Sequence, residues 1–282
     1  MTTTLHPPTS EDIGHFYDQM GQFFALVWGE SIHAGYWRDS HDDASFSQAQ
    51  DQFTDLLIGT LQDANIQAGK QFLDVGCGTG RPAIRLAQAT GCEVTGITVS
   101  QTQIGQANAA AAAEGVSDRV RFQYGNAMEM PFADNSFDAA WAFESMFHME
   151  DRAQVLSEIR RVLRPGGVLL IADPIENTPM TEDQRIILYS AFAVSSFISK
   201  ETYGDTVRQA GLELVDILDV TRNIQKTVSK TLENMPQRQA ELSAIYGAAV
   251  MEMMDQSWPI VAQIYEHSIG YVVIAARKPL DA

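Results

Sequence analysis

The chain has few basic residues and few cysteines. Its 282 residues include 19 Lys and Arg against 36 Asp and Glu, which gives a formal net charge of −17 at pH 7. A strongly negative protein repels nucleic acid and anionic membranes, so we expect neither as a partner. The two cysteines, Cys77 and Cys92, indicate a reducing compartment rather than a disulfide-stabilised secreted domain.

Long apolar runs are also missing. No stretch approaches the ~20 consecutive apolar residues of a membrane-spanning helix. Residues 1–8 show neither the basic nor the apolar segment of a secretion signal, and we interpret them as a short tail. We therefore expect a cytoplasmic protein without a membrane partner, and a homo-oligomer is possible.

Strand and helix patterns alternate along most of the chain. Strand-like apolar stretches lie at 71–75, 93–98, 120–124, 137–143 and 168–173, with helical patterns between them at 83–89, 100–114 and 152–162. This alternation predicts an α/β fold with a parallel, doubly wound sheet. Two further strands, at 212–220 and 270–276, are expected to complete a mostly parallel sheet of seven strands with helices on both faces.

The most informative segment is a glycine turn after the first predicted strand. Asp74 is followed by Gly76, Gly78 and Gly80, and a helical pattern comes next. Strand, glycine turn and helix form a nucleotide-binding arrangement, because glycine lets the backbone approach a ligand. A dinucleotide loop would need glycine where Arg81 stands, which disfavours NAD.

This spacing resembles motif I of the class I S-adenosylmethionine (SAM) methyltransferases. The resemblance implies that the backbone of Gly76 and Gly78 meets the methionine part of SAM and that Asp74 orients its ammonium group. Most class I enzymes have an acid at the Thr98 position to hold the ribose, so Gln101 and Gln103 are expected to share that task. The remaining contacts expected at the third and fourth strand ends are Asn126, Ala127, Met128 and Phe143.

A dense group of aromatic residues lies near the N-terminus. Tyr17 and Trp37 belong to it and are counted among the predicted cofactor contacts. Such aromatics can be core, or they can line a lid over a sulfonium, where cation–π attraction helps binding.

Three residues are candidates for acid–base chemistry. His148 follows the fourth strand, where a neutral imidazole could take a proton from an acceptor near pH 7. It could instead pack at a helix start or contact the cofactor. Asp173 ends the fifth strand and could orient His148 or cap the loop. His33 is the second candidate base, although a structural role for it is the stronger interpretation.

Nearly the whole chain, from about residue 13 to 279, resembles SAM methyltransferases of natural-product pathways. The motifs include F-Y-D at 16–18, W-A-F-E-S-M-F-H-M at 141–149 and G-Y-V-V-I-A-A-R-K-P at 270–279. The resemblance implies a Rossmann-like enzyme of secondary metabolism, such as antibiotic biosynthesis. It would move a methyl group from SAM to a small, fairly hydrophobic acceptor and release S-adenosylhomocysteine.

The acceptor atom stays open. In sugar O-methyltransferases of this kind a His-His pair and an Asp serve proton removal, and Phe147 replaces the first His here. O-, N- and C-methylation therefore remain possible. The alternative is a SAM-binding protein of the same fold that catalyses a cyclisation or only binds its ligand. We expect no metal, because the chain shows no zinc-ligand spacing and no Asp-Asn pair after Asp173.

The chain divides into three expected regions. Residues 1–70 would form a helical N-terminal lid and residues 71–173 the SAM-binding Rossmann-like core. Residues 174–282 would complete the sheet and supply a cap from 174–199 and from one or two long helices over 225–266. An insertion at the carboxyl edge of a sheet most often covers the substrate. Packing or dimer helices are the alternative.

Overall fold

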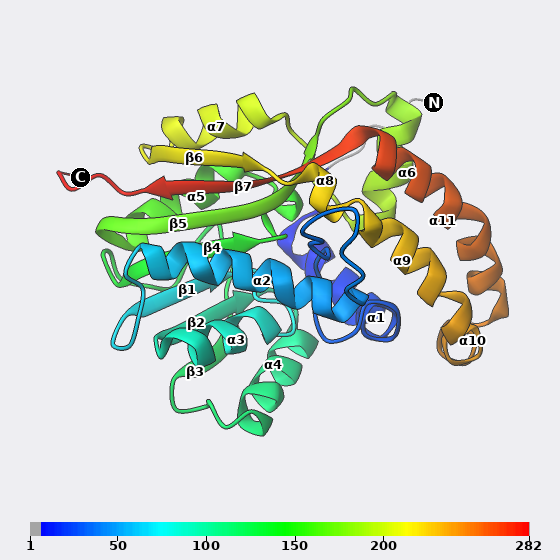
Figure 1. Ribbon diagram of the computed structural model, residues 1–282, viewed down its shortest axis with the longest axis horizontal. Coiled ribbons are helices and arrows are strands. Elements are labelled where there is room, and N and C mark those ends of the chain that lie inside the picture. The colour runs from blue at the N-terminus through cyan, green and yellow to red at the C-terminus, as the bar shows by residue number, and fades with distance from the viewer. Residues whose placement is uncertain (1–6, 282) are drawn as a thin grey trace.

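The computed structural model describes residues 7–281, which form one sheet with helices on both faces (Figure 1). Within this range the 7 strands run in the order β3-β2-β1-β4-β5-β7-β6. Strand β7 is antiparallel to both of its neighbours, and the other pairs are parallel. The strands are β1 (Gln71–Val75), β2 (Glu93–Thr98), β3 (Val120–Tyr124), β4 (Phe137–Phe143), β5 (Leu163–Glu176), β6 (Glu213–Asp219) and β7 (Ile269–Arg277). The predicted α/β fold is confirmed.

Helices cover the two faces of the sheet because strand side chains alternate between them. Phe72 belongs to one buried cluster and Leu73 to the other. The first cluster takes in α2 (Phe46–Asp63), α3 (Arg81–Thr90) and α4 (Gln101–Ala113), and the second takes in α5 (Arg152–Val162) and α7 (Lys200–Gln209). The strand order reverses between β1 and β4, and ligands of such sheets bind outside the strand ends at that point.

A helical cap lies at one end of the sheet (Figure 1). It contains α1 (Ser10–Val27), α6 (Glu182–Phe192), α9 (Lys226–Asn234), α10 (Gln239–Tyr246) and α11 (Ala248–Ser268), with the short helices η1 (Met146–His148), α8 (Thr221–Ile224) and η2 (Pro236–Arg238) between elements. The cap has its own core, which includes Phe23, Phe24, Leu188, Leu242, Met251 and Trp258.

The connection from β6 to β7 differs from the expected one or two helices over 225–266. Pro236 begins the short helix η2, and Gly247, at φ +86°, separates α10 from α11. These interruptions fold the segment back on itself. None of the helices within residues 7–281 combines the length and the apolar character needed to cross a bilayer. Residues 1–6 of the predicted tail lie outside the described residues.

Candidate active site

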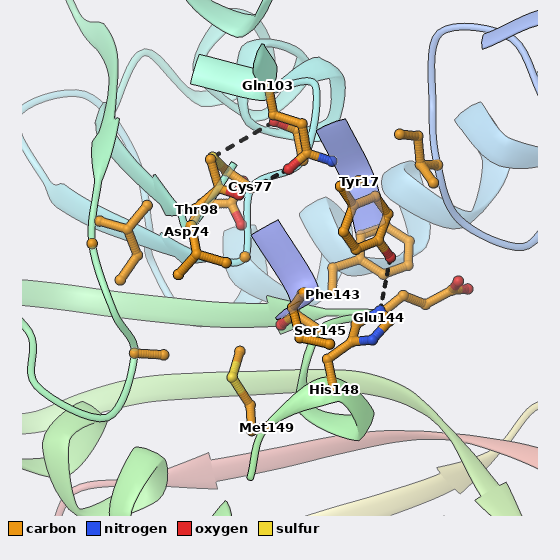
Figure 2. Close-up of a pocket in the computed structure, with 18 of the residues that line it drawn as sticks. Tyr17, Asp74, Cys77, Thr98, Gln103, Phe143, Glu144, Ser145, His148 and Met149 are labelled. Carbon is orange, nitrogen blue, oxygen red and sulfur yellow. Dashed lines mark hydrogen bonds between the residues drawn. The ribbon is translucent and has the colours of Figure 1, made fainter. Parts of the chain in front are cut away.

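A cavity of about 970 Å³, part of it open to solvent, lies at the carboxyl ends of β1, β2 and β4. Its wall comes from these strand ends, from α1 and from the segment before α2 (Figure 2). The structure brings most of the predicted cofactor contacts to this wall: Tyr17, Asp74, Gly76, Gly78, Thr98, Gln103, Asn126, Ala127, Met128 and Phe143. Two of the three candidate acid–base residues, His33 and His148, line it as well.

The glycine turn approaches the end of β4 closely. Gly76 has φ +82°, and its N–H and that of Cys77 donate to the Ile97 carbonyl at 2.9 and 3.0 Å. A Cβ added at Gly76 would stand 2.3 Å from the Ser145 Cβ, so only glycine fits there. Gly78 also has a positive φ, +52°, and a Cβ there would meet open space on the cavity side. The turn therefore leaves room for a ligand against bare backbone.

Polar side chains at the strand ends are already paired with one another. The Thr98 hydroxyl donates to the Gln103 Oε1 at 2.8 Å, and both side chains are buried. The Asn126 Oδ1 accepts from the Met128 N–H at 2.9 Å, which orders the loop after β3. Gln101 does not join this group, because it is exposed on the outer side of α4. The prediction that Gln101 contacts the cofactor is therefore not supported.

Asp74 lies under the glycine turn and is buried. Burial raises the pKa of its carboxyl to about 7, because the carboxylate loses its hydration there. A cationic ammonium group placed in the cavity would compensate that charge. The chemistry of this wall thus fits the zwitterionic methionine part of SAM.

His148 holds helix α1 against the cavity. Its Nδ1 lies 3.0 Å from the Ala193 carbonyl, which can only accept, so Nδ1 carries the proton. Its Nε2 lies 2.7 Å from the Tyr17 hydroxyl, which therefore donates to it (Figure 2). Burial lowers the pKa of His148 to about 4. Both ring nitrogens are engaged, so His148 presents no open lone pair to a ligand.

Asp173 does not orient His148 as expected. Its Oδ2 accepts from the Tyr203 hydroxyl of α7 at 3.1 Å. The reason is the alternation of β5: Ile171 packs in the cluster beneath α5 and α7, and Asp173, two residues on, shares that face. This pairing corrects the prediction, and Asp173 is buried away from the cavity wall.

Trp37 also lies elsewhere. Its indole N–H donates to the Ala44 carbonyl at 3.0 Å, and its ring stacks on Phe46. Trp37 is therefore a buried anchor of the N-terminal segment and not part of the cavity wall. His33 lines the cavity with its Nδ1 2.8 Å from the Ala34 carbonyl, and burial lowers its pKa to about 4. These contacts fit the structural role considered for His33.

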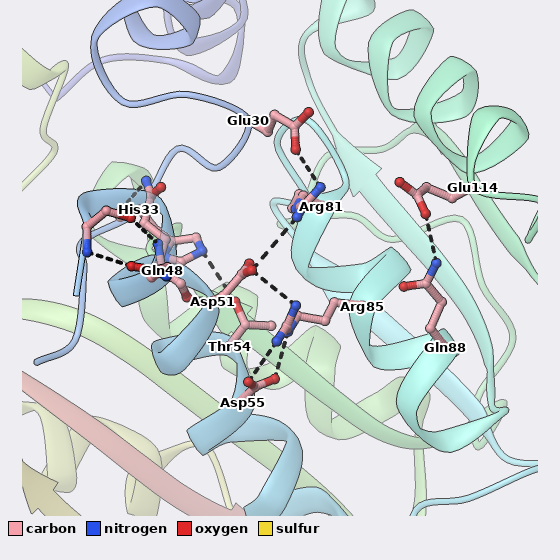
Figure 3. A network of polar contacts seen from close by, with 12 residues as sticks. Glu30, His33, Gln48, Asp51, Thr54, Asp55, Arg81, Arg85, Gln88 and Glu114 are labelled. Carbon is pink, nitrogen blue, oxygen red and sulfur yellow. Dashed lines mark hydrogen bonds and ion pairs between the residues drawn. The ribbon is translucent and has the colours of Figure 1, made fainter. Parts of the chain in front are cut away.

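An ion-pair network fastens the N-terminal segment to the helix after the glycine turn (Figure 3). Arg85 of α3 reaches Asp55 at 2.7 Å and Asp51 at 3.2 Å, both on α2. Arg81 pairs with Glu30 and approaches Asp51 at 3.8 Å. Arg81 stands where a dinucleotide loop would need glycine. Here it links α3 to the segment before α2, which forms part of the cavity wall.

Glu144 is the functional candidate that the sequence analysis left without a role. It follows β4 with φ +48°, a left-handed conformation that is rare for residues other than glycine. Its Oε1 accepts from the Ala34 N–H at 2.7 Å and from the Tyr271 hydroxyl at 2.9 Å. Burial raises the pKa of Glu144 to about 7. The signal in the sequence was a charged residue directly after an apolar strand.

A second cavity, of about 550 Å³ with part of it open to solvent, lies between the sheet and the cap. Its wall is mostly apolar and aromatic: Trp28, Ala34, Phe147, Pro174, Phe192, Phe197, Val228, Trp258, Val261, Ala262 and Tyr265. Thr227, Thr231 and Glu144 add polar groups, and the buried indole N–H of Trp28 has no hydrogen-bond partner among residues 7–281. Glu144 also lines the first cavity, so the two cavities meet at this residue.

Comparison with known proteins decides the family. A family described as a methyltransferase domain matches residues 73–171. The chain is 41% identical to (+)-O-methylkolavelool synthase of Herpetosiphon aurantiacus, over 96% of this chain and 95% of that protein. It is 37% identical to 27-O-demethylrifamycin SV methyltransferase of Amycolatopsis mediterranei, over 96% of this chain and 98% of that protein. The chain belongs to the class I SAM-dependent methyltransferases.

The crystal structure of the cyclase SpnF shares the fold of this methyltransferase. It matches with a TM-score of 0.84 and 34% identity, over 99% of this chain and 100% of that chain. The predicted family, with SAM as its cofactor, and methyl transfer as the enzyme's activity are confirmed. The first cavity, with its bare glycine turn and buried Asp74, is the part of this methyltransferase that fits SAM.

Proposed function

We propose that this methyltransferase moves the methyl group of SAM to a hydroxyl group of an uncharged, largely apolar natural product held in the second cavity. The observation that carries the proposal is the composition of that cavity's wall. The second cavity meets the SAM cavity at Glu144. Among the described residues, no Lys, Arg or His lines the second cavity. Aromatic and aliphatic side chains would supply most of the binding energy through burial of apolar surface.

The absence of Lys, Arg and His from this wall, among the described residues, argues against phosphorylated acceptors. Burying a phosphate without a positive partner is costly, because the charge loses its hydration. The formal net charge of −17 adds long-range repulsion. The buried Trp28 N–H offers a donor to an acceptor oxygen. The names of the two relatives, which both denote O-methyl chemistry, support oxygen as the receiving atom.

The residues of the chain divide the work between the two cavities. SAM supplies an electrophilic methyl group on a sulfonium sulfur. The glycine turn, Asp74 and the pair Thr98–Gln103 would hold it, while α1 and the segment before α2 form the lid. The cap helices would position the acceptor for in-line attack, so that proximity provides most of the rate enhancement. His148, which the sequence predicts as the base, competes for that role with Glu144, the residue that lines both cavities.

The test uses the purified full chain with SAM and (+)-kolavelool, the alcohol whose O-methyl ether gives the 41% identical relative its name. Mass spectrometry should detect S-adenosylhomocysteine and a methyl ether in equal amounts. Geranyl diphosphate is the charged control and should give neither product. Turnover of the diphosphate would contradict the proposal. SAM binding without formation of S-adenosylhomocysteine from any apolar alcohol would favour the non-methylating alternative, which the likeness to SpnF motivates.

A further inference from the structure

Glu144 occupies the boundary between the cofactor cavity and the acceptor cavity. Among residues 7–281 it is the one residue that lines both. We propose that Glu144 is the catalytic base, which accepts the proton of the acceptor hydroxyl during methyl transfer. This inference rests on the proposed function, because it requires a hydroxyl group in the second cavity.

The carboxylate is held from two sides. The Ala34 N–H and the Tyr271 hydroxyl both donate to Oε1, and they come from the N-terminal segment and from β7. No residue within 7–281 donates a hydrogen bond to Oε2, so this oxygen can receive a proton from a ligand. In Figure 2 the carboxylate extends past the His148 ring, away from Asp74 and the glycine turn. It therefore points away from the part of the wall that fits the methionine group.

The backbone of Glu144 is strained in a way that favours a functional role. Its φ of +48° is unusual for a side chain with a Cβ, and such conformations gather at active sites. The peptide is held there because the Glu144 N–H donates to the Ala172 carbonyl at 2.8 Å. From this turn the side chain reaches the Ala34 N–H and the Tyr271 hydroxyl.

His148 is the competing base, and its geometry is less suitable. The Tyr17 hydroxyl occupies the Nε2 lone pair, and the proton on Nδ1 is bound to the Ala193 carbonyl. His148 lines the cofactor cavity but not the acceptor cavity. It therefore supports α1, whereas Glu144 reaches both reactants.

Titratable groups of several neighbouring elements lie around the carboxylate. Four of them interact with its charge: Tyr17 of α1, Asp173 of β5, Tyr265 of α11 and Tyr271 of β7. His33 precedes Ala34, which donates to the carboxylate, and the His148 ring of η1 lies beside the Glu144 side chain in Figure 2. Burial is the largest influence on the pKa of each, and it disfavours the charged form in every case. Burial likewise raises the pKa of Glu144 to about 7, so the carboxylate form becomes dominant just above neutral pH.

The step balances without a further reactant. As the acceptor oxygen attacks the methyl carbon, the O–H bond breaks and its proton moves to Glu144 Oε2. An O–CH₃ bond forms, and the S–CH₃ bond breaks with its electron pair left on sulfur, which becomes a neutral thioether. Glu144 is then a carboxylic acid, and it returns the proton to solvent before the next turnover.

The experiment compares the full-length wild type with Glu144→Gln, His148→Asn and, as a matched control on the exposed side of α11, Glu266→Gln. Gln at 144 keeps an oxygen for the Ala34 and Tyr271 hydrogen bonds but cannot take a proton. With (+)-kolavelool and SAM we expect E144Q to lower kcat by roughly 100-fold or more, the low end for loss of a positioned base. The kcat of the wild type should rise with pH through about 7, as Glu144 becomes a carboxylate. H148N should keep this rise, and E266Q should behave as wild type.

A second readout does not depend on turnover. Infrared difference spectra of wild type against E144Q, both with S-adenosylhomocysteine bound, isolate the Glu144 carboxyl band. That band should disappear as the pH rises through about 7. An E144Q enzyme with wild-type kcat and pH profile, or a carboxyl that is already ionised at pH 5, would overturn the role of Glu144 alone. If the wild type methylates no apolar alcohol, the proposed function fails and this role fails with it.

Discussion

Replacement of Glu144 by Gln should change how the stability of the protein depends on pH. Burial raises the pKa of Glu144 from 4.5 to about 7, so the folded protein keeps a proton that the unfolded chain has released between these values. The free energy of unfolding therefore falls as the pH rises through this window. Because Gln cannot ionise, the free energy of unfolding of E144Q should lack this fall with pH.

The magnitude follows from the pKa difference. One pKa unit corresponds to about 1.4 kcal/mol, so the rise from 4.5 to about 7 is worth about 3 kcal/mol. Glu144 keeps a partial exposure to the cavities, and water that reaches the carboxylate reduces this value. Relative to the wild type, E144Q should gain up to about 3 kcal/mol of stability between about pH 4.5 and pH 8.

Urea unfolding of both proteins across that pH range measures the effect. Glu266→Gln is the matched control, because it makes the same substitution at an exposed position of α11. The reasoning is refuted if the difference between E144Q and the wild type is the same at both ends of the range. It is also refuted if E144Q loses stability relative to the wild type as the pH rises.

Three further substitutions test the rest of the site. Tyr17→Phe leaves the buried Nε2 of His148 without its donor, and urea unfolding should show a loss of about 1–3 kcal/mol; an unchanged value would mean that this contact does not hold α1. Gly76→Ala forces a Cβ into φ +82°, which costs about 1–2 kcal/mol before the clash is counted. Calorimetry should show at least tenfold weaker binding of S-adenosylhomocysteine, whereas Gly59→Ala, in open space on α2, should leave the affinity unchanged. Ala262→Phe narrows the second cavity, so the KM for (+)-kolavelool should rise while the Kd for S-adenosylhomocysteine stays the same; equal effects on both would show that the cavities are not separate sites.

The fold and the cofactor side of the site could be predicted because they depend on local patterns. The alternation of apolar strands and helices predicted the sheet, and the spacing of Gly76 and Gly78 predicted the turn that leaves room for a ligand. These features need only the residues of neighbouring elements. Thr98 and Asn126 were predicted for the same reason, since Thr98 is the last residue of β2 and Asn126 lies two residues after the end of β3.

The acceptor side depends on contacts between distant segments, and the sequence does not contain that geometry in readable form. Tyr17 and Trp37 lie in the same aromatic region, yet only Tyr17 lines the cavity, because Trp37 is bound to the Ala44 carbonyl. Asp173 was misplaced because the face toward which a buried strand residue points decides its partner. Glu144 gains its environment from Ala34 and Tyr271, which stand 110 and 127 residues away in the chain.

The most direct test of the account follows the methyl group itself. The wild type is incubated with SAM carrying a deuterated methyl group and with (+)-kolavelool, and the product is examined by mass spectrometry and NMR. The account predicts a deuterated methyl ether at the hydroxyl oxygen, formed together with an equal amount of S-adenosylhomocysteine. A label on carbon or nitrogen, or a protein that binds SAM and transfers nothing to this or any other apolar alcohol, would contradict it.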